Sequence, residues 1–353
     1  MADPPNPKAG FYYNVYIHHG QDDSLPNEWA QAQGTDKYNM PYLTLPYEIV
    51  PNGDSIYHEG FHIFQYAANS PGYKYSGDSQ WYIEAAAEWY ATKYDPTNAN
   101  AFVDCGSIVA NPQLALWHSF DNQAPADPAA DAGPEGWMYG VRQYGMHTYL
   151  WFLTEVAKIN KAFITEGFYA KTDLSPQEYL YTKVGCVTSK ELFTLWAAQN
   201  TANMSYITRE QYDRGLLEIT NAGTWDLYRP YVWQGLNNGT GGVWFAPAKE
   251  LLPRGWAYNV FRINNTLTGA YSFEIQGEPL GSQGGAADFH AMIVVMKKNG
   301  PQYFPLLKES PLLSTGAVDV TPSDAAVFLV VASVPEVFGT YQNYPYKARI
   351  TRE

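Results

Sequence analysis

The segment YHEGFHIFQ, residues 57–65, places two histidines four positions apart with a glutamate between them. His58, Glu59 and His62 fit the pattern H-E-x-x-H. On a helix, positions i and i+4 share one face, so both imidazoles can reach a single ion at about 2.0–2.1 Å. Glu59 then projects beside the ion, where its carboxylate can take a proton from water. The alternative is two ordinary hydrogen-bonded histidines on an amphipathic helix.

Turn signals predict two successive helices around this motif. After the turn PNGD, an Asp or Ser side chain can cap a helix over about residues 54–69, which the run NSPG ends. A second helix is predicted over about residues 78–94, where an Asp-Pro pair follows. The motif therefore lies in the first helix of a helical pair.

The second helix supplies candidates for a third metal ligand, which a catalytic zinc site needs in addition to an open fourth position. It contains WYIEAAAEWYA, with Glu84 22 residues after His62 and Glu88 one turn later. Carboxylates at i and i+4 repel each other mildly on a bare helix, and a cation removes that repulsion. We predict that Glu84 binds the metal and that Glu88 accepts the free N–H of His58 and orients it. The alanines at 85–87 allow close approach of the two helices.

The two motifs together resemble the gluzincin branch of the zinc metallopeptidases. In that family both motif histidines and a downstream glutamate bind Zn²⁺, and the motif glutamate is the general base. The resemblance covers about residues 42–94 and implies that His58, His62 and Glu84 are the ligands and Glu59 the base. It also implies that the strand before the first helix lies along the substrate.

The wider pattern, H-E-x-F-H-x-x-Q followed by a W-x-x-E-rich helix, is similar to that of secreted bacterial zincin-like proteins with a C-terminal β-sandwich. Phe61, Gln65 and Trp81 fit this pattern. The chain departs from the gluzincin sequence N-E-x-x-x-D, because Ile83 precedes the ligand glutamate and Glu88 replaces the aspartate. The longer carboxylate can still reach a histidine.

Hydrolysis at a polarised carbonyl also needs a hydrogen-bond donor for the developing oxyanion. A third predicted helix, about residues 137–159, offers Tyr139, Arg142, Tyr144 and His147. Tyr144 and His147 share a face at i and i+3, so we predict these two as the donors. The alternative is that these side chains belong to the core.

The composition is that of a globular protein with an excess of aromatic side chains. The 353 residues are 46% hydrophobic and include 29 Tyr, 11 Trp and 16 Phe. Aromatic surfaces often contact sugars or peptides, although a tyrosine-rich core is equally consistent. The formal net charge of −13 and the lack of a Lys/Arg cluster argue against nucleic acid and anionic membranes as partners. The longest apolar run, AAVFLVVASV, is too short to span a bilayer.

The N-terminal segment and the cysteines bear on the compartment. The start MADPPNPKAG has no apolar region, so we expect no signal peptide in this chain. Given the resemblance, we predict a secreted or periplasmic protein whose leader has been removed. Cys105 and Cys186 are the only cysteines; they can form one disulfide or remain thiols, and they are too few for a cysteine zinc site.

We predict an α+β fold in two domains. Residues 1–234 would form a zincin-like catalytic domain, with a small edge sheet containing FYYNVYI and YLTLPYEIV beside the active-site helices. The Ala/Pro/Asp-rich run 121–136 is predicted to be a long surface loop. Residues 235–353 contain short apolar or alternating segments separated by Gly, Pro and Asn turns, which predict an all-β sandwich.

The predicted function is that of a zinc-dependent hydrolase, most simply a metallopeptidase that acts on a peptide, protein or glycoprotein with Glu59 as general base. Two alternatives stay open. One is a non-catalytic binding protein on the same scaffold, whose aromatic surface and sandwich hold a glycan or cell-wall polymer. The other is a metal-dependent hydrolase of glycan esters or amides, which the same ligands would serve equally well.

Overall fold

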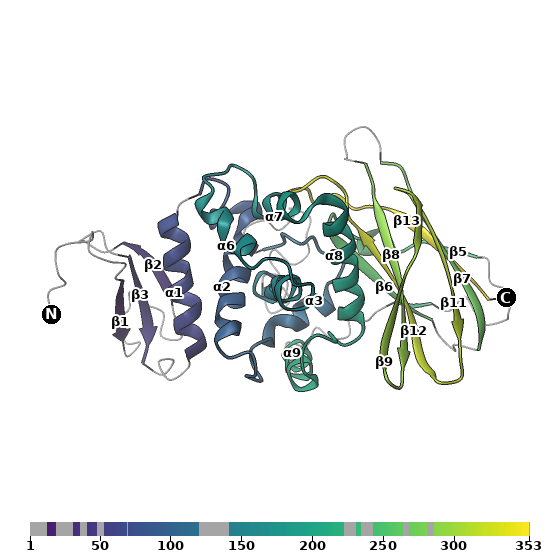
Figure 1. Cartoon of the computed structure of the whole chain (residues 1–353), viewed down its shortest axis with the longest axis horizontal. Coiled ribbons are helices and arrows are strands. Elements are labelled where there is room, and N and C mark those ends of the chain that lie inside the picture. The colour runs from purple at the N-terminus through teal and green to yellow at the C-terminus, as the bar shows by residue number, and fades with distance from the viewer. Residues whose placement is uncertain are drawn as a thin grey trace.

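The computed structural model describes residues 13–18, 31–35, 41–47, 53–68, 70–119, 141–221, 231–233, 243–263, 268–280 and 286–352. Along the longest axis of the molecule, a small sheet is followed by a helical region and then by two larger sheets (Figure 1). The chain is therefore α+β, with helices before sheets, as the sequence predicts. Within the described ranges, no helix has the length and apolar character of a membrane span.

The small sheet packs against the helix that carries the H-E-x-x-H motif. Its strands β1 (Asn14–His18), β3 (Pro41–Pro46) and β2 (Gln31–Thr35) lie in the order β1-β3-β2, with β1 parallel and β2 antiparallel to β3. Leu43 and Leu45 of β3 contact Ile63 in a separate apolar cluster. The two predicted strands are present in β1 and β3. The sequence QAQGT of β2 has no apolar alternation to reveal it.

Helices α1 (Gly53–Ala68) and α2 (Gln80–Tyr94) pack side by side at their predicted positions, with a short 3-10 turn, η1 (Gly77–Ser79), before α2. The three alanines at 85–87 are fully buried, which permits the close approach. Trp81 and Trp89 point from α2 into the helical region, where their indole N–H groups donate to Gln177 and Thr154 at 3.1 and 3.0 Å. The helix α2 is thus enclosed and held in a defined rotation.

The remaining helices complete the helical region, in which α5 packs directly against α2. They are η2 (Val103–Cys105), α3 (Gly106–Ala110), α5 (His147–Trp151), η3 (Phe152–Val156), α6 (Ala162–Tyr169), α7 (Pro176–Val184), α8 (Cys186–Thr201) and α9 (Arg209–Asn221).

The long helix predicted over 137–159 is interrupted. Residues 141–145 are helical, a turn follows at Met146, α5 comes next, and η3 is a π-helical turn. The hydroxyl of Thr154 donates to the carbonyl of Leu150 at 2.9 Å, a local bond that disturbs helix geometry. The predicted surface loop 121–136 lies outside the described residues.

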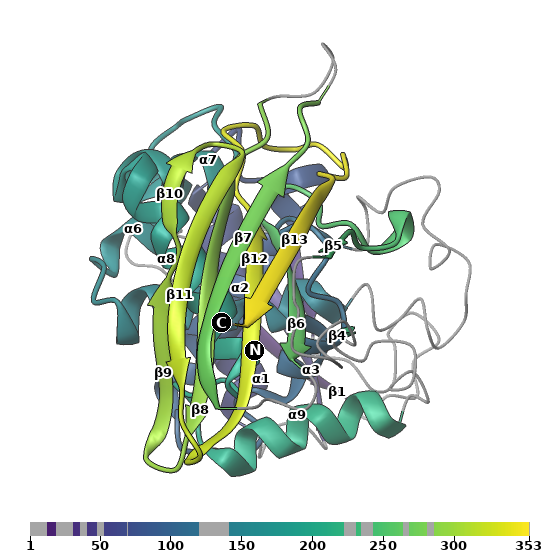
Figure 2. The ribbon, with the colours of Figure 1, turned by 90° about the vertical axis from the view of Figure 1, so that its right-hand side faces the viewer.

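Two five-stranded sheets form the C-terminal part (Figure 2). The first has the order β4-β6-β12-β8-β9 and consists of β4 (Tyr231–Trp233), β6 (Ala257–Ile263), β12 (Asp324–Ser333), β8 (Phe289–Lys297) and β9 (Gly300–Pro305). The second has the order β10-β11-β7-β13-β5 and consists of β10 (Leu307–Ser310), β11 (Leu313–Val320), β7 (Gly269–Gly277), β13 (Tyr346–Arg352) and β5 (Trp244–Phe245), with a short 3-10 helix η5 (Lys249–Leu251) after β5.

The first of these sheets is buried on both faces, which explains its almost continuous apolar sequences. Val294 and Val330 point toward the helices and join the same core as α2 and α8, while Ile293 and Leu329 point toward the second sheet. The second sheet buries one face only, so β7 and β13 alternate between buried and half-exposed residues. The core of the helical region therefore extends to one face of the first sheet, and a second apolar cluster fills the space between the two sheets.

The predicted segments VWFAP, AYNVFRI, AYSFEIQG, FHAMIVVMK, AVFLVVASV and YKARI coincide with β5, β6, β7, β8, β12 and β13. Strands β4, β9, β10 and β11 were not predicted; Pro, Lys and Gly interrupt the sequences of the last three. The predicted domain boundary between residues 234 and 235 lies outside the described residues and stays a prediction.

Candidate metal centre

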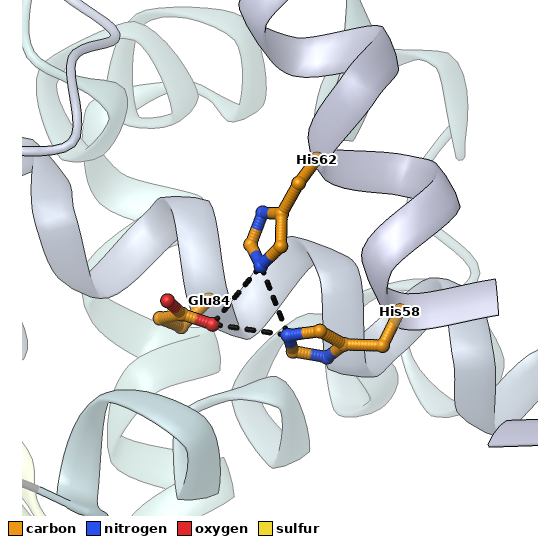
Figure 3. A group of neighbouring side chains, drawn as sticks. All are labelled: His58, His62 and Glu84. Atoms are coloured by element: carbon orange, nitrogen blue, oxygen red, sulfur yellow. Dashed lines mark hydrogen bonds and ion pairs between the residues drawn. The ribbon is translucent and has the colours of Figure 1, made fainter. Parts of the chain in front are cut away.

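Three predicted ligand atoms converge between α1 and α2 (Figure 3). The Nε2 atoms of His58 and His62 lie 2.9 Å apart, and Oε2 of Glu84 lies 3.1 Å from the first and 3.3 Å from the second. All three residues are buried. The helical spacing of the two histidines brings their rings to one side of α1, and α2 supplies the carboxylate from across the helix pair.

The size of this triangle matches a metal site. Ligand atoms at about 2.0–2.1 Å from a tetrahedral ion lie about 3.3–3.4 Å from one another. The three observed separations are at this value or slightly below it. Two imidazoles and one carboxylate are also a donor set found in catalytic metal sites. The group can therefore hold a metal ion.

The other ring nitrogen of each histidine faces an oxygen acceptor. Nδ1 of His58 lies 2.9 Å from Oε1 of Glu88, which is ion-pair distance without the alignment of a hydrogen bond. The sequence predicts that Glu88 accepts this N–H. Nδ1 of His62 lies 2.7 Å from Oε1 of Gln65, and Gln65 in turn donates from Nε2 to the carbonyl of Ile83 at 2.9 Å. Acceptors at Nδ1 place the proton of a neutral imidazole there and leave Nε2 as a lone pair.

This arrangement directs two lone pairs and a carboxylate toward one point, so the centre attracts positive charge. Burial alone would lower the pKa of His58, but the carboxylates of Glu88 and Glu84 outweigh it and raise that pKa well above its ordinary value. Burial would raise the pKa of Glu84, but His62 and His58 hold it below its usual range. A proton and a metal ion compete for the same place.

Glu59, the predicted base, is buried on α1 next to the ligand His58 and does not belong to the converging group. Its nearest titrating neighbours include Tyr66, whose pKa burial and the charges of Glu84 and Glu59 raise to about 12. Tyr66 is 40% exposed, and its ring is stacked on that of His62 with centroids 6.0 Å apart.

The two predicted oxyanion donors are placed differently from one another. The ring of Tyr144 is stacked 6.0 Å from that of His58, and burial, followed by the charge of Glu84, raises its phenol pKa. His147 is buried against Phe102, and its Nδ1 and Nε2 lie 2.9 and 3.1 Å from the carbonyls of Tyr144 and Ala101. Tyr144 lies at the centre, and the ring nitrogens of His147 face backbone instead.

Tyr75 is a residue of this centre that the sequence did not reveal. Burial, followed by the charge of Glu84, raises the pKa of its phenol, and its ring meets that of His62 edge-on at 6.5 Å. It is 41% exposed, so it borders the route from solvent to the ligands. Tyr75 belongs to the irregular connection between the two helices, where no periodic pattern marks the direction of a side chain.

The cysteines take no part in the centre. Cys105 is buried and Cys186 is exposed, and both are free thiols. The alternative of a disulfide between them is therefore excluded in this structure.

Comparisons with known proteins identify no family. The sequence matches no family model and no curated protein. Among solved structures, it is similar to the CBM22-1 and GH10 modules of Clostridium thermocellum endo-1,4-β-D-xylanase 10B (11% identity, 28% of this chain and 19% of that chain, TM-score 0.20). It is also similar to the CBM22-1 xylan-binding domain of Paenibacillus barcinonensis Xyn10C (12% identity, 33% and 88%, TM-score 0.22). A third similar structure is a GH115 4-O-methyl-α-glucuronidase (8% identity, 77% and 40%, TM-score 0.21). TM-scores this low do not define a common fold.

Proposed function

We propose that this chain is a zinc-dependent hydrolase of the gluzincin type, and specifically a metallopeptidase with a zincin-like helical region. The observation that supports this most is the triangle of His58, His62 and Glu84, in which both histidines have their second nitrogen turned to an oxygen acceptor. Here three acceptor atoms face one another in a buried place, which is unfavourable without a cation.

Each protein group has one task in this proposal. His58, His62 and Glu84 bind the ion, and Glu88 and Gln65 fix the two imidazole rings. When bound, Zn²⁺ supplies a Lewis acid that polarises the scissile carbonyl and makes water more acidic. The carboxylate of Glu59 accepts a proton from the attacking water and returns it to the departing amine nitrogen.

Tyr75 and Tyr144 are the proposed donors to the developing oxyanion. Burial and the charge of Glu84 raise the pKa of both phenols, so both hydroxyls keep their protons at neutral pH. A protonated phenol in a partly desolvated place stabilises negative charge by a hydrogen bond. The half-exposed rings of Tyr66 and Tyr75 border the approach, and we propose that a peptide or glycoprotein segment reaches the centre between them.

The test combines metal analysis with hydrolysis of a peptide library. Protein purified without chelator should contain about one zinc per chain. Glu59→Gln should keep that zinc and lose activity by about 10²–10⁴-fold, the usual contribution of a general base. His62→Ala should lose both zinc and activity, and Glu191→Gln, an exposed glutamate on α8, is the matched control that should change neither.

Two results would refute the proposal. One is protein that binds no transition metal when it is offered in excess. The other is hydrolysis that continues undiminished in Glu59→Gln. Zinc bound without turnover of any peptide, together with turnover of acylated sugars, would keep the metal centre and change the substrate class.

A further inference from the structure

A guanidinium group lies buried between the helices and the sheets, away from the metal ligands. Arg142 is 1% exposed. Its Nη2 donates to the carbonyl of Leu114 at 3.0 Å, whereas Nε and Nη1 have no acceptor in the part of the chain that the structure describes. Buried arginines normally form hydrogen bonds to a carboxylate or to several carbonyls, because an unbalanced charge is costly in a protein interior.

The group remains charged at neutral pH. Burial lowers the pKa of Arg142 only to about 10. No carboxylate of the described residues forms an ion pair with it. Its titratable neighbours are the guanidinium of Arg254, which is charged, and the phenol of Tyr258, whose pKa burial raises to about 12. The fully buried imidazole of His118 is a further neighbour, and burial, followed by Arg142 and Arg254, lowers its pKa. The environment is therefore electropositive.

The turn that contains the Leu114 carbonyl also holds a second buried polar side chain without a partner among the described residues. Asn111 begins the turn, and its carbonyl accepts from the backbone N–H of Leu114, the residue whose own carbonyl accepts from Arg142. The Asn111 side chain is 0% exposed, and neither its Nδ2 nor its Oδ1 has a partner among the described residues. Tyr258 closes the turn from β6, since its backbone N–H donates to the carbonyl of Pro112 at 2.8 Å.

We propose that Arg142 is the centre of a buried binding site for a small monovalent anion of the chloride class. The anion accepts from Nε and Nη1 of Arg142, with the Asn111 amide as a further donor, and it neutralises the charge that the protein leaves unbalanced. A water molecule can accept the same hydrogen bonds but brings no negative charge. A larger oxyanion carries several oxygens, which need more donors than one guanidinium and one amide provide.

Arg142 is two residues away in the sequence from Tyr144 of the proposed catalytic centre, but the anion site does not depend on that centre. Gln143 follows Arg142 in the helical residues 141–145, and its side chain is close enough to the phenols of Tyr75 and Tyr144 to lower the pKa of each against the effect of burial. The anion thus anchors the short helix that supports those two tyrosines. Anion binding is expected whether or not the metal centre hydrolyses peptides.

The experiment measures thermal unfolding of the full chain at constant ionic strength while sodium gluconate is replaced by sodium chloride or bromide. A saturable rise of the midpoint is expected, roughly 3–8 °C at about 100 times the Kd. The rise should be absent in Arg142→Gln and unchanged in Arg209→Gln, an exposed arginine paired with Asp213. Equal midpoints in chloride and gluconate, or an equal response to sulfate, would overturn the proposal.

A second measurement covers the case in which Arg142→Gln does not fold. Crystals of the unaltered protein are soaked in bromide, and an anomalous difference map is calculated at the bromine edge. A peak within hydrogen-bond distance of Nε or Nη1 of Arg142 supports the site. A map with no peak there refutes it, whatever the variant does.

Discussion

Replacing Glu88 by glutamine should weaken metal binding by about ten- to a hundredfold and leave the fold intact. Oε1 of Glu88 lies 2.9 Å from Nδ1 of His58, and its side chain is 28% exposed. The glutamine carbonyl can still accept the Nδ1 proton, so the ring keeps its orientation. The substitution removes only the negative charge of Glu88. That charge makes the His58 imidazole a better electron donor and also attracts the divalent ion that His58 binds.

The expected loss corresponds to about 1.4–2.7 kcal/mol of binding free energy. Glu88→Leu removes the acceptor as well as the charge, so the ring of His58 is free to turn. Its loss of binding free energy should therefore be at or above the upper end of that range. Gln65→Met provides the comparison on the other histidine. Gln65 is a neutral amide held by the carbonyl of Ile83, so its removal should cost orientation without any change of charge.

The assay is competition for zinc against a chromophoric chelator, with circular dichroism to establish that each variant is folded. Glu191→Gln serves as the control for loss of one exposed carboxylate. If Glu88→Gln binds zinc as tightly as the unaltered protein, Glu88 does not act on His58. If it loses zinc as completely as Glu84→Gln, Glu88 is itself a ligand, and the proposed division of roles is wrong.

Two further predictions concern stability. Ala86→Leu should lower the free energy of unfolding by about 1–3 kcal/mol in urea titrations, because residue 86 is fully buried in a tightly packed core. The control, Ala67→Leu on the exposed side of α1, should change that free energy little. Equal effects of the two substitutions would contradict the close packing. Burial and the charge of Lys308 lower the pKa of His290 to about 4. Between about pH 6.5 and pH 4 the unfolded chain therefore binds a proton that the folded chain does not, and stability falls as the pH falls through that window. His290→Asn should flatten this dependence in urea titrations against pH; an identical slope in both proteins would refute it.

The relative positions of residues within each helix of the centre were predictable, because they depend only on local helix geometry. Helix periodicity alone brings His58 and His62 to one side of α1, and the same rule sets Glu84 and Glu88 one turn apart on α2. Alanines between the carboxylates indicated that the helices approach closely, and residues 85–87 are indeed fully buried. Strands β6 and β8 were equally predictable from the sequence, since turn residues bound their apolar runs.

Contacts between distant segments were not predictable in the same way. Tyr75 reaches Glu84 from an irregular connection, where no period constrains the direction of its side chain. Lys190 of α8 forms ion pairs at 2.8 Å with Asp288 and Glu336 from the sheet region, which ties helices to sheets across about a hundred residues of chain or more. The interruption of the helix after residue 145, which turns the ring nitrogens of His147 toward backbone carbonyls, is likewise a result of packing.

What the sequence alone determined is the set of chemical groups and their spacing within single helices, because hydrogen bonding between neighbouring turns fixes that spacing wherever a helix forms. Only the tertiary structure decided which of these groups meet: that α2 presents Glu84 to the two histidines, that the Ile83 carbonyl of α2 accepts from Gln65, and that Arg142 is buried without a counter-charge among the described residues. These outcomes depend on how whole elements pack, and packing follows the combined burial of many side chains and no single local pattern.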